Sequence, residues 1–180
     1  AKIEAEKSLT AAVESSKYDE EGQKSIEAII EKAKADLKNA KTEEEIKAVK
    51  EAAKNEIEAV LTSEEKAEIA AIENIGGSGA DGRMKFIAKS KLTKRKGKRA
   101  VRIRWNVPND MELDGFQVFR STKKNKFGEK PYFTTKKNTY INTKNLKNGK
   151  TYYYKVRGFK EINGQTVYTD WSTKAYRTLR

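Results

Sequence analysis

The spacing of hydrophobic residues in this chain changes once, and the change falls at a glycine-rich stretch. Before that stretch, apolar residues recur every three or four positions in residues 26–40 and again in residues 46–60, as on one face of an amphipathic helix. After it, apolar and polar residues alternate in residues 101–105 and 151–159, which is typical of half-buried strands. Residues 76–82 hold four Gly in seven positions and indicate a flexible joint.

The charge of the chain divides at the same place. Residues 1–75 hold 12 basic and 19 acidic residues, a net charge of −7, whereas the remaining residues hold 27 basic and 7 acidic residues, a net charge of +20. Two segments that differ this much in charge and period are expected to be separate domains. We therefore predict a helical module at residues 1–75, a linker at residues 76–83 and a β-domain at residues 84–180.

The first segment predicts an all-α three-helix bundle with short connections. A short helix containing Leu9 precedes the two helices identified by their period, and Thr42 followed by Glu45 is a capping box at the start of the second of these. Ser63, with two Glu behind it, is interpreted as a further N-cap. Either a short fourth helix begins there or the third helix continues through it.

The second segment predicts an antiparallel sandwich, because short alternating runs are separated by turn residues. Residues 108–110 (Pro-Asn-Asp) are expected to form one such turn, and Ile162 to Gln165 a hairpin turn. Seven strands are expected, around Phe86–Leu92, Val101–Trp105, Gly115–Phe119, Tyr132–Thr134, Thr139–Ile141, Thr151–Phe159 and Val167–Trp171.

Several short motifs in this segment resemble those of bacterial fibronectin type III domains. Trp105 ends the second expected strand, where that family keeps a core Trp, and Leu146, Gly149 and Tyr152 match its L-x-x-G-x-x-Y tyrosine corner. The runs DGFQVFRS and YTDWS are also similar to members of the family. The resemblance implies a seven-stranded immunoglobulin-like sandwich whose core includes Trp105, Leu146, Tyr152, Tyr154 and Val156.

The helical segment loosely resembles the FIVAR-type modules of Gram-positive surface proteins. The resemblance rests on the runs KYDEEGQ and AKTEEEIKAVKEAAKNEI and covers about the first 65 residues. It implies a spacer or adhesive module.

The three consecutive tyrosines at positions 152–154 separate by the parity of the strand. Tyr152 and Tyr154 are expected to point into the core, whereas Tyr153 points outward with Lys155 and Arg157. These three outward residues are the predicted centre of a polyanion-binding surface, in which Tyr153 would provide a stacking face and the two cations would hold phosphate or sulfate groups. We favour the alternative that basic charge is spread around the module without one dedicated site, since Arg102 and Arg104 are expected to face outward from the other sheet.

The chain contains no Cys and no His, so it lacks thiol chemistry, disulfides and the commonest general base and metal ligand. The Gly-Lys-Thr run at positions 149–151 is no phosphate-binding loop, because Lys144 stands where the motif needs Gly. Residues 110–115 resemble the start of a calcium loop, yet Ser121 stands where that loop needs Glu. No catalytic, cofactor-binding or metal residue is predicted.

The sequence thus predicts non-catalytic accessory, adhesion or spacer modules from a longer, multi-modular bacterial surface or secreted protein. One alternative is a polyanion-binding module for teichoic acid, a glycosaminoglycan or nucleic acid, and another is an accessory region of a carbohydrate-active enzyme. The expected partners are neighbouring domains and cell-wall or host polyanions or proteins. The chain is expected to be a monomer outside the cell, with no cofactor and no membrane span.

Overall fold

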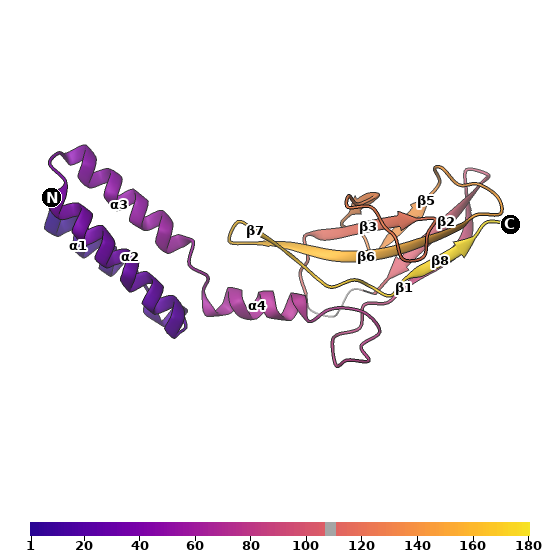
Figure 1. The fold of residues 1–180 in the computed structure, drawn as a ribbon, viewed down its shortest axis with the longest axis horizontal. Coiled ribbons are helices and arrows are strands. Elements are labelled where there is room, and N and C mark those ends of the chain that lie inside the picture. The colour runs from indigo at the N-terminus through magenta and orange to yellow at the C-terminus, as the bar shows by residue number, and fades with distance from the viewer. Residues whose placement is uncertain (107–110) are drawn as a thin grey trace. The chain divides into compact units, whose positions relative to one another are not determined.

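The computed structural model describes residues 1–106 and 111–180, so the turn expected at residues 108–110 lies outside the described residues. The chain divides into two compact units, Ala1–Glu68 and Ile69–Arg180 (Figure 1). Within the described ranges, the first unit and the segment after it hold four α-helices, and the second unit holds eight strands. Helices followed by an antiparallel β-domain are the fold class that the sequence predicts, which is confirmed.

Three helices of the first unit pack against one another around a small apolar core. They are α1 (Lys2–Ala11), α2 (Glu20–Asn39) and α3 (Glu43–Glu58), with a 3-10 turn at Ser15–Lys17 between the first two. Apolar residues recur every three or four positions along each helix, so they lie on one face, and these faces meet to form the core. Leu9, Ala33 and Ala53 form one buried cluster and Ile26, Ile30 and Ile57 another, and Ala5, Leu37 and Ala40 are buried as well.

The helix α4 (Ser63–Glu73) is separate from α3, which ends at Glu58. The residue that caps α4 is Thr62 and not Ser63, so the sequence-based assignment of this cap was wrong by one position. Thr62 Oγ1 accepts a hydrogen bond from the Glu65 amide at 3.2 Å, and Glu65 Oε2 accepts one from the Thr62 amide at 2.7 Å. This reciprocal pair is a capping box, the same device that Thr42 and Glu45 form at α3.

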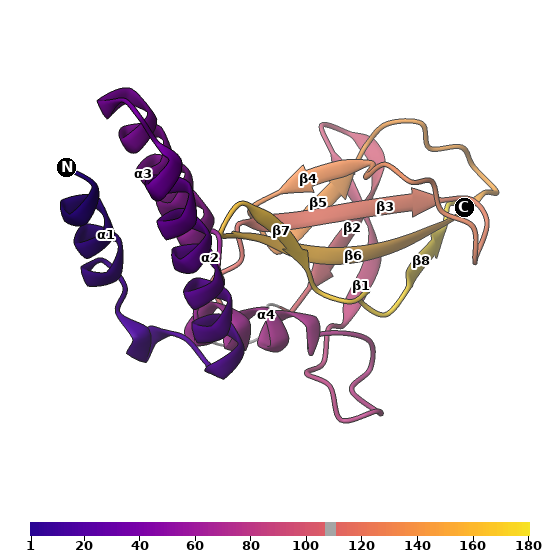
Figure 2. The ribbon, with the colours of Figure 1, turned by 60° about the vertical axis from the view of Figure 1, so that its left-hand side comes forward.

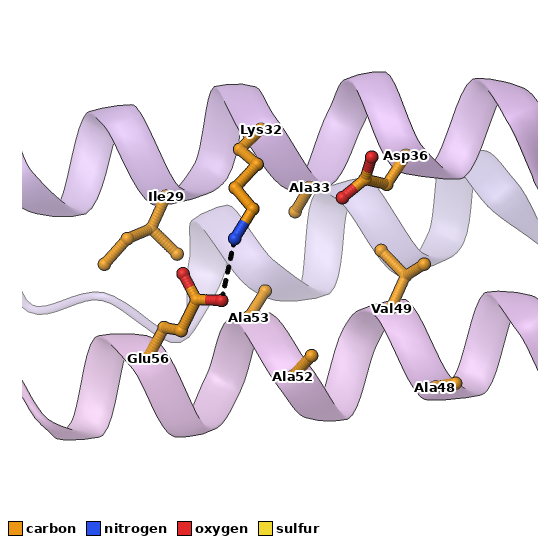
Figure 3. A pocket seen from close by; sticks show the side chains of 9 residues that line it. All are labelled: Ile29, Lys32, Ala33, Asp36, Ala48, Val49, Ala52, Ala53 and Glu56. Carbon is orange, nitrogen blue, oxygen red and sulfur yellow. Dashed lines mark hydrogen bonds and ion pairs between the residues drawn. The ribbon is translucent and has the colours of Figure 1, made fainter.

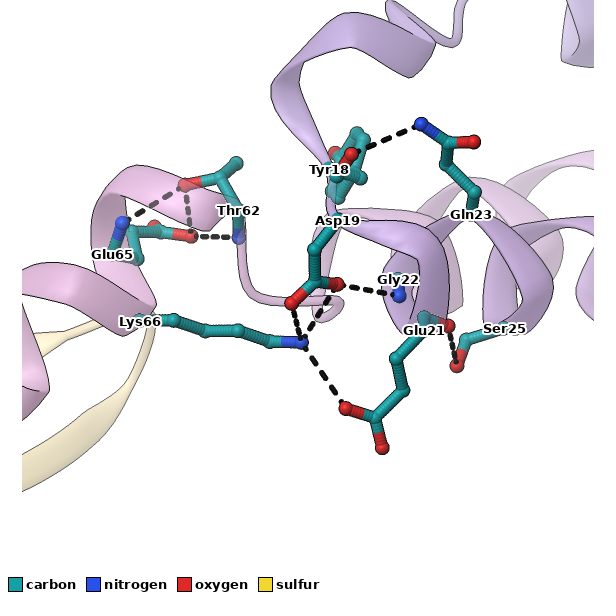
Figure 4. A network of polar contacts seen from close by, with 9 residues as sticks. All are labelled: Tyr18, Asp19, Glu21, Gly22, Gln23, Ser25, Thr62, Glu65 and Lys66. Atoms are coloured by element: carbon teal, nitrogen blue, oxygen red, sulfur yellow. Dashed lines mark hydrogen bonds and ion pairs between the residues drawn. The ribbon is translucent and has the colours of Figure 1, made fainter.

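One carboxylate joins the start of α2 to the first turn of α4 (Figure 4). Asp19 caps α2 by accepting a hydrogen bond from the Gly22 amide at 2.8 Å, and its carboxylate also pairs with Lys66 Nζ at 2.8 Å. Lys66 lies 3.5 Å from a Glu21 carboxylate oxygen as well. The Lys66 ammonium, followed by the Gly22 amide, lowers the pKa of Asp19, so the carboxylate stays ionised where the helix dipole favours a negative charge.

The second unit is a sandwich of two antiparallel sheets (Figure 2). One sheet has the order β1-β2-β5, and the other has the order β4-β3-β6-β7 with β8 also paired to β6. The strands are β1 (Ala88–Arg95), β2 (Lys98–Trp105), β3 (Gly115–Ser121), β4 (Phe133–Thr135), β5 (Thr139–Asn142), β6 (Thr151–Ile162), β7 (Gln165–Tyr168) and β8 (Ala175–Thr178).

The described residues form eight strands where the sequence predicted seven, because the last expected strand is replaced by two. The C-terminal half of β6 pairs with β7, and its N-terminal half pairs with β8. Between them the chain departs from the ladder, and the Ser172 hydroxyl accepts a hydrogen bond from the Val156 amide at 2.9 Å. The Ser172 side chain thus takes the place of a backbone carbonyl as the acceptor for the Val156 amide, where the chain passes from β7 to β8.

The core of the sandwich lies between the two sheets. Trp105 is 4% exposed and packs edge-on against Phe116 with 5.4 Å between ring centroids. Tyr152, Tyr154 and Val156 are buried, and Leu146 packs against them from the side. The Tyr152 hydroxyl accepts a hydrogen bond from the Lys147 amide at 2.8 Å, which is the backbone contact that defines a tyrosine corner.

The glycine-rich stretch expected as a linker is bound to the sandwich within the second unit. Ile75 is fully buried in the sandwich core. Gly76 donates to the Met84 carbonyl and Gly77 to the Trp171 carbonyl, both at 2.9 Å. Gly77 has φ = 58°, a left-handed conformation that Gly adopts without strain. The glycines therefore shape a turn that returns the chain to the sheets, and the boundaries of independent folding stay a prediction.

In the described part of the chain, no helix combines the length and the apolar character needed to cross a bilayer.

Replacing Ile75 with Ala should destabilise the sandwich by about 2–5 kcal/mol, the usual range for a buried Ile. Leu92→Ala is the matched control, because Leu92 belongs to the same unit and is 46% exposed, so it should cost far less. Urea unfolding followed by Trp fluorescence measures both. Equal, small effects would show that residues 76–83 tether the chain without packing against it.

Tyr152→Phe should cost about 1–3 kcal/mol, because it removes the acceptor for the Lys147 amide while leaving the ring in place. Tyr176→Phe on the neighbouring strand is the control, since Tyr176 is 64% exposed. Thermal unfolding compares the two. If the two variants unfold alike, the hydroxyl of Tyr152 has no structural role.

Candidate functional site

The predicted binding residues Tyr153, Lys155 and Arg157 all lie on the outward face of β6, and each is half-buried. The structure brings the two cations together but separates them from Tyr153. The ring of Tyr153 lies beside that of Tyr176 on β8, with 6.0 Å between centroids. The three residues therefore belong to two neighbouring clusters of the same face.

Lys155 and Arg157 are stacked on aromatic rings of the protein itself. Lys155 Nζ lies 3.4 Å from the centroid of Trp171, and Arg157 Cζ lies 3.8 Å from that of Tyr168 and 5.1 Å from that of Trp171. Trp171 also meets Phe119 of β3 edge-on at 5.0 Å. Contacts of this kind stabilise the folded protein by about 0.5–2 kcal/mol each, depending on how far the cation is desolvated.

The surroundings of these two cations also restrict their use by a ligand. Burial, followed by the charge of Arg157, lowers the pKa of Lys155. Arg157 Nε donates to Gln117 Oε1 at 2.9 Å, so part of its hydrogen-bonding capacity is already used. We call this group of two cations and their rings the β6 stack; its members are Phe119, Lys155, Arg157, Tyr168 and Trp171.

The opposite sheet carries a different arrangement of basic residues on its outward face. In the antiparallel register of β1 and β2, Lys89 lies directly opposite Arg104, and Lys91 lies directly opposite Arg102. Lys89, Lys91 and Arg104 are exposed and Arg102 is half-buried. None of the four forms an ion pair with any residue that the structure describes. We call these four residues the cation ladder.

A groove of about 730 Å³ lies at the open side of the sandwich, between β4 and β5. These are edge strands, because each ends its sheet. Three aromatic side chains line the groove, together with Ile141, three Thr and three cations. The aromatic residues are Tyr132, Phe133 and Tyr140, the Thr residues are at positions 135, 139 and 143, and the cations are Arg95, Lys137 and Lys144.

The rings in this groove are held in place by one another and by a guanidinium. Phe133 stacks on Tyr140 with 4.4 Å between centroids and 24° between planes. Arg120 donates to the Tyr132 hydroxyl at 3.0 Å and lies 4.5 Å from its ring centroid. Burial raises the pKa of Tyr140 to about 12, so its hydroxyl stays protonated and can donate a hydrogen bond. The groove can thus offer a ring face, hydroxyl groups and positive charge.

The sequence pattern did not single out the groove or the full ladder. The adjacent aromatics Tyr132 and Phe133 with Tyr140 seven residues later were the available signal for the groove, and they were interpreted as strand residues. The alternating Lys89 and Lys91 before Arg102 and Arg104 were the signal for the ladder. Their pairing depends on register, which a single sequence does not specify.

A smaller groove of about 230 Å³ lies between α2 and α3 (Figure 3). Ala side chains and Val49 line it, and an ion pair of 3.0 Å between Lys32 and Glu56 spans the two helices. Among the described residues, no group of Asp and Glu side chains is arranged to hold a metal ion.

No family model matches this chain, and a search of curated proteins also returns no match. Solved structures include fibronectin type III domains similar to about half of the chain. A human fibronectin type III domain is 19% identical with a TM-score of 0.43, covering 64% of this chain and 80% of that domain. A fibronectin type III-like protein of Clostridium thermocellum is 21% identical with a TM-score of 0.39, covering 53% of this chain and 92% of that one.

A β-1,2-glucanase of Parabacteroides distasonis is 20% identical with a TM-score of 0.37, and the similarity covers 52% of this chain. The chain spans only 12% of the length of that glucanase.

The double variant Lys155→Met, Arg157→Met should destabilise the sandwich by about 1–4 kcal/mol, the sum of two such contacts, and should leave binding to heparin nearly unchanged. Met keeps an unbranched apolar side chain like the stems of Lys and Arg but removes their positive charge. Urea unfolding measures stability, and retention on a heparin column measures binding. Normal stability with a large loss of retention would mean that these cations are available to a ligand after all.

Proposed function

We propose that the chain is a non-catalytic, extracellular accessory region of a multi-modular bacterial protein, in which the sandwich binds and the helical unit spaces or presents neighbouring domains. The observation that carries this proposal is the lining of the sandwich groove. It offers rings, hydroxyls and cations, with no carboxylate among its described lining residues, on an open surface. Such a lining suits recognition, whereas hydrolysis of a glycan would call for paired acidic groups.

The helical unit fits the role of a spacer in this proposal. Its residues 1–68 hold 12 basic and 18 acidic residues, and most of the charged side chains are exposed. The resemblance of its sequence to FIVAR-type modules of Gram-positive surface proteins stays a prediction, as do the adhesive role, the monomeric state and the location outside the cell.

Polyanion binding is the second candidate function, and the cation ladder favours it. Residues 69–180 hold 27 basic and 8 acidic residues. A surface with this excess of positive charge attracts phosphate and sulfate polymers by electrostatics alone. The ladder makes this attraction more specific in position, because the strand register holds four cations close together on one outward face.

The full chain should be retained by an anionic polysaccharide and should not cleave it. Affinity electrophoresis through gels containing heparin or polygalacturonate measures retention, and an assay for new reducing ends measures cleavage. Retention should fall steeply as salt rises from 50 to about 200 mM, as for other electrostatic contacts. New reducing ends would refute a non-catalytic role, and unretarded migration at low salt would refute polyanion binding.

A further inference from the structure

We propose that the cation ladder and the groove between β4 and β5 form one continuous site for a linear anionic glycan, a polysaccharide that bears carboxylate or sulfate groups. The inference rests on the proposed role of the sandwich as a binding module and adds the location and the ligand class. Each part of the site is argued below from register, burial and charge.

The register of the first sheet places the ladder beside the groove. Arg104 lies opposite Lys89 on one side and Thr139 on the other, and Arg102 lies opposite Lys91 and Ile141 in the same way. Directly opposite residues point to the same face of a sheet. Since Thr139 and Ile141 line the groove, two rows of side chains run from the exposed cations of β1 across β2 to the groove.

The four cations of the ladder form a compact array. Neighbouring strands are about 4.8 Å apart, and alternate residues of one strand are about 6.8 Å apart. Like charges directly opposite each other destabilise a sheet, yet here two such pairs are adjacent. A bound chain with regularly spaced anionic groups would relieve this repulsion at both pairs, because each anionic group can lie between two cations.

The groove supplies the contacts that charge alone does not. Phe133 is 44% exposed, and its ring is held by stacking on Tyr140, so it offers one ordered ring face to the apolar side of a sugar. Thr135, Thr139 and Thr143 offer hydroxyls for exchange with sugar hydroxyls. Lys137 and Lys144 continue the positive charge of the ladder along the groove.

The same features make other occupants less suitable. Single-stranded nucleic acid binds to successive aromatic platforms, whereas the groove offers one stacked pair. A second copy of the chain would bring two ladders with the same sign of charge together, which repel. The β6 stack is less suited to the glycan, because its cations already contact rings and Gln117.

The test uses the full chain and three variants. Arg102→Ser, Arg104→Ser removes half of the ladder, and Phe133→Ala removes the exposed ring of the groove. Lys124→Ser, Lys126→Ser is the matched control, because it removes two charges from exposed positions of the segment between β3 and β4. Calorimetric titration with heparin, polygalacturonate, neutral dextran and single-stranded oligo-dT gives affinities, and thermal unfolding reports folding.

We expect the ladder variant to bind both anionic glycans about tenfold more weakly than the unmodified chain, and the matched control less than about twofold more weakly. Phe133→Ala should weaken glycan binding about three- to tenfold with an unchanged salt dependence, since it removes no charge. The ladder variant should unfold at the same or a higher temperature, because it relieves repulsion between like charges.

Equal losses in the ladder variant and the matched control would overturn the site while leaving polyanion binding intact. Tighter binding of oligo-dT than of either glycan, with the same dependence on Arg102, Arg104 and Phe133, would overturn the ligand class. Equal affinity for neutral dextran would overturn the role of charge. Cleavage of a glycan would instead refute the proposed non-catalytic function, and binding of none of the probes would refute the site.

Discussion

The pairing of β6 with strands on both of its sides is the constraint on which the sandwich depends. It pairs with β3 along one edge and with β7 and β8 along the other. Every second residue of β6 points toward the opposite sheet, so Tyr152, Tyr154 and Val156 are buried. A shift by one residue would exchange these with Tyr153, Lys155 and Arg157 and would bury two charges. The register is therefore strongly specified, and the outward face is specified with it.

This constraint also explains which parts of the structure the sequence could predict. The alternation along β6 is a local signal that separates Tyr152 and Tyr154 from Tyr153, and the resemblance to a tyrosine corner indicated which set faces the core; Tyr152 and Tyr154 are both buried. The capping box of α3 is local as well, and Thr42 and Glu45 form it as expected. Local patterns of this kind need no knowledge of the remaining chain.

The parts that the sequence could not predict depend on distant contacts. Ile75 precedes a run of Gly that is typical of a linker, and only its burial among the strands shows that it belongs to the core. Trp171 was placed in a strand, but it lies at a bend where it reaches Lys155. The cap at Thr62 instead of Ser63 shows the usual uncertainty of one or two residues at helix ends.

The two faces of the sandwich use basic residues in different ways, and this difference bears on where a ligand can bind. On β6, rings that come from β3, β7 and the bend cover the cations. On β1 and β2, the cations are directly opposed and no ring among the described residues covers them, so their mutual repulsion remains in the folded state. The ladder has four cations and the β6 stack has two, and burial and ring contacts also make the ladder cations the more accessible to an anion.

The position of the groove follows from how the sandwich closes. On the side where β1 meets β8, the Ser90 hydroxyl donates to the Tyr176 carbonyl at 2.6 Å, and the Arg177 guanidinium donates to the Ser90 carbonyl. These contacts join the two sheets and occupy their polar groups. On the other side, β4 and β5 each end a sheet, and aromatic side chains fill part of the space between them. Arg120 of β3 donates to the carbonyls of Lys144 and Asn145, just after β5, and the groove lined by side chains beside these contacts leaves room for a ligand. Because that edge lies beside the cation ladder, the fold places this groove next to four cations that form no ion pair with any described residue.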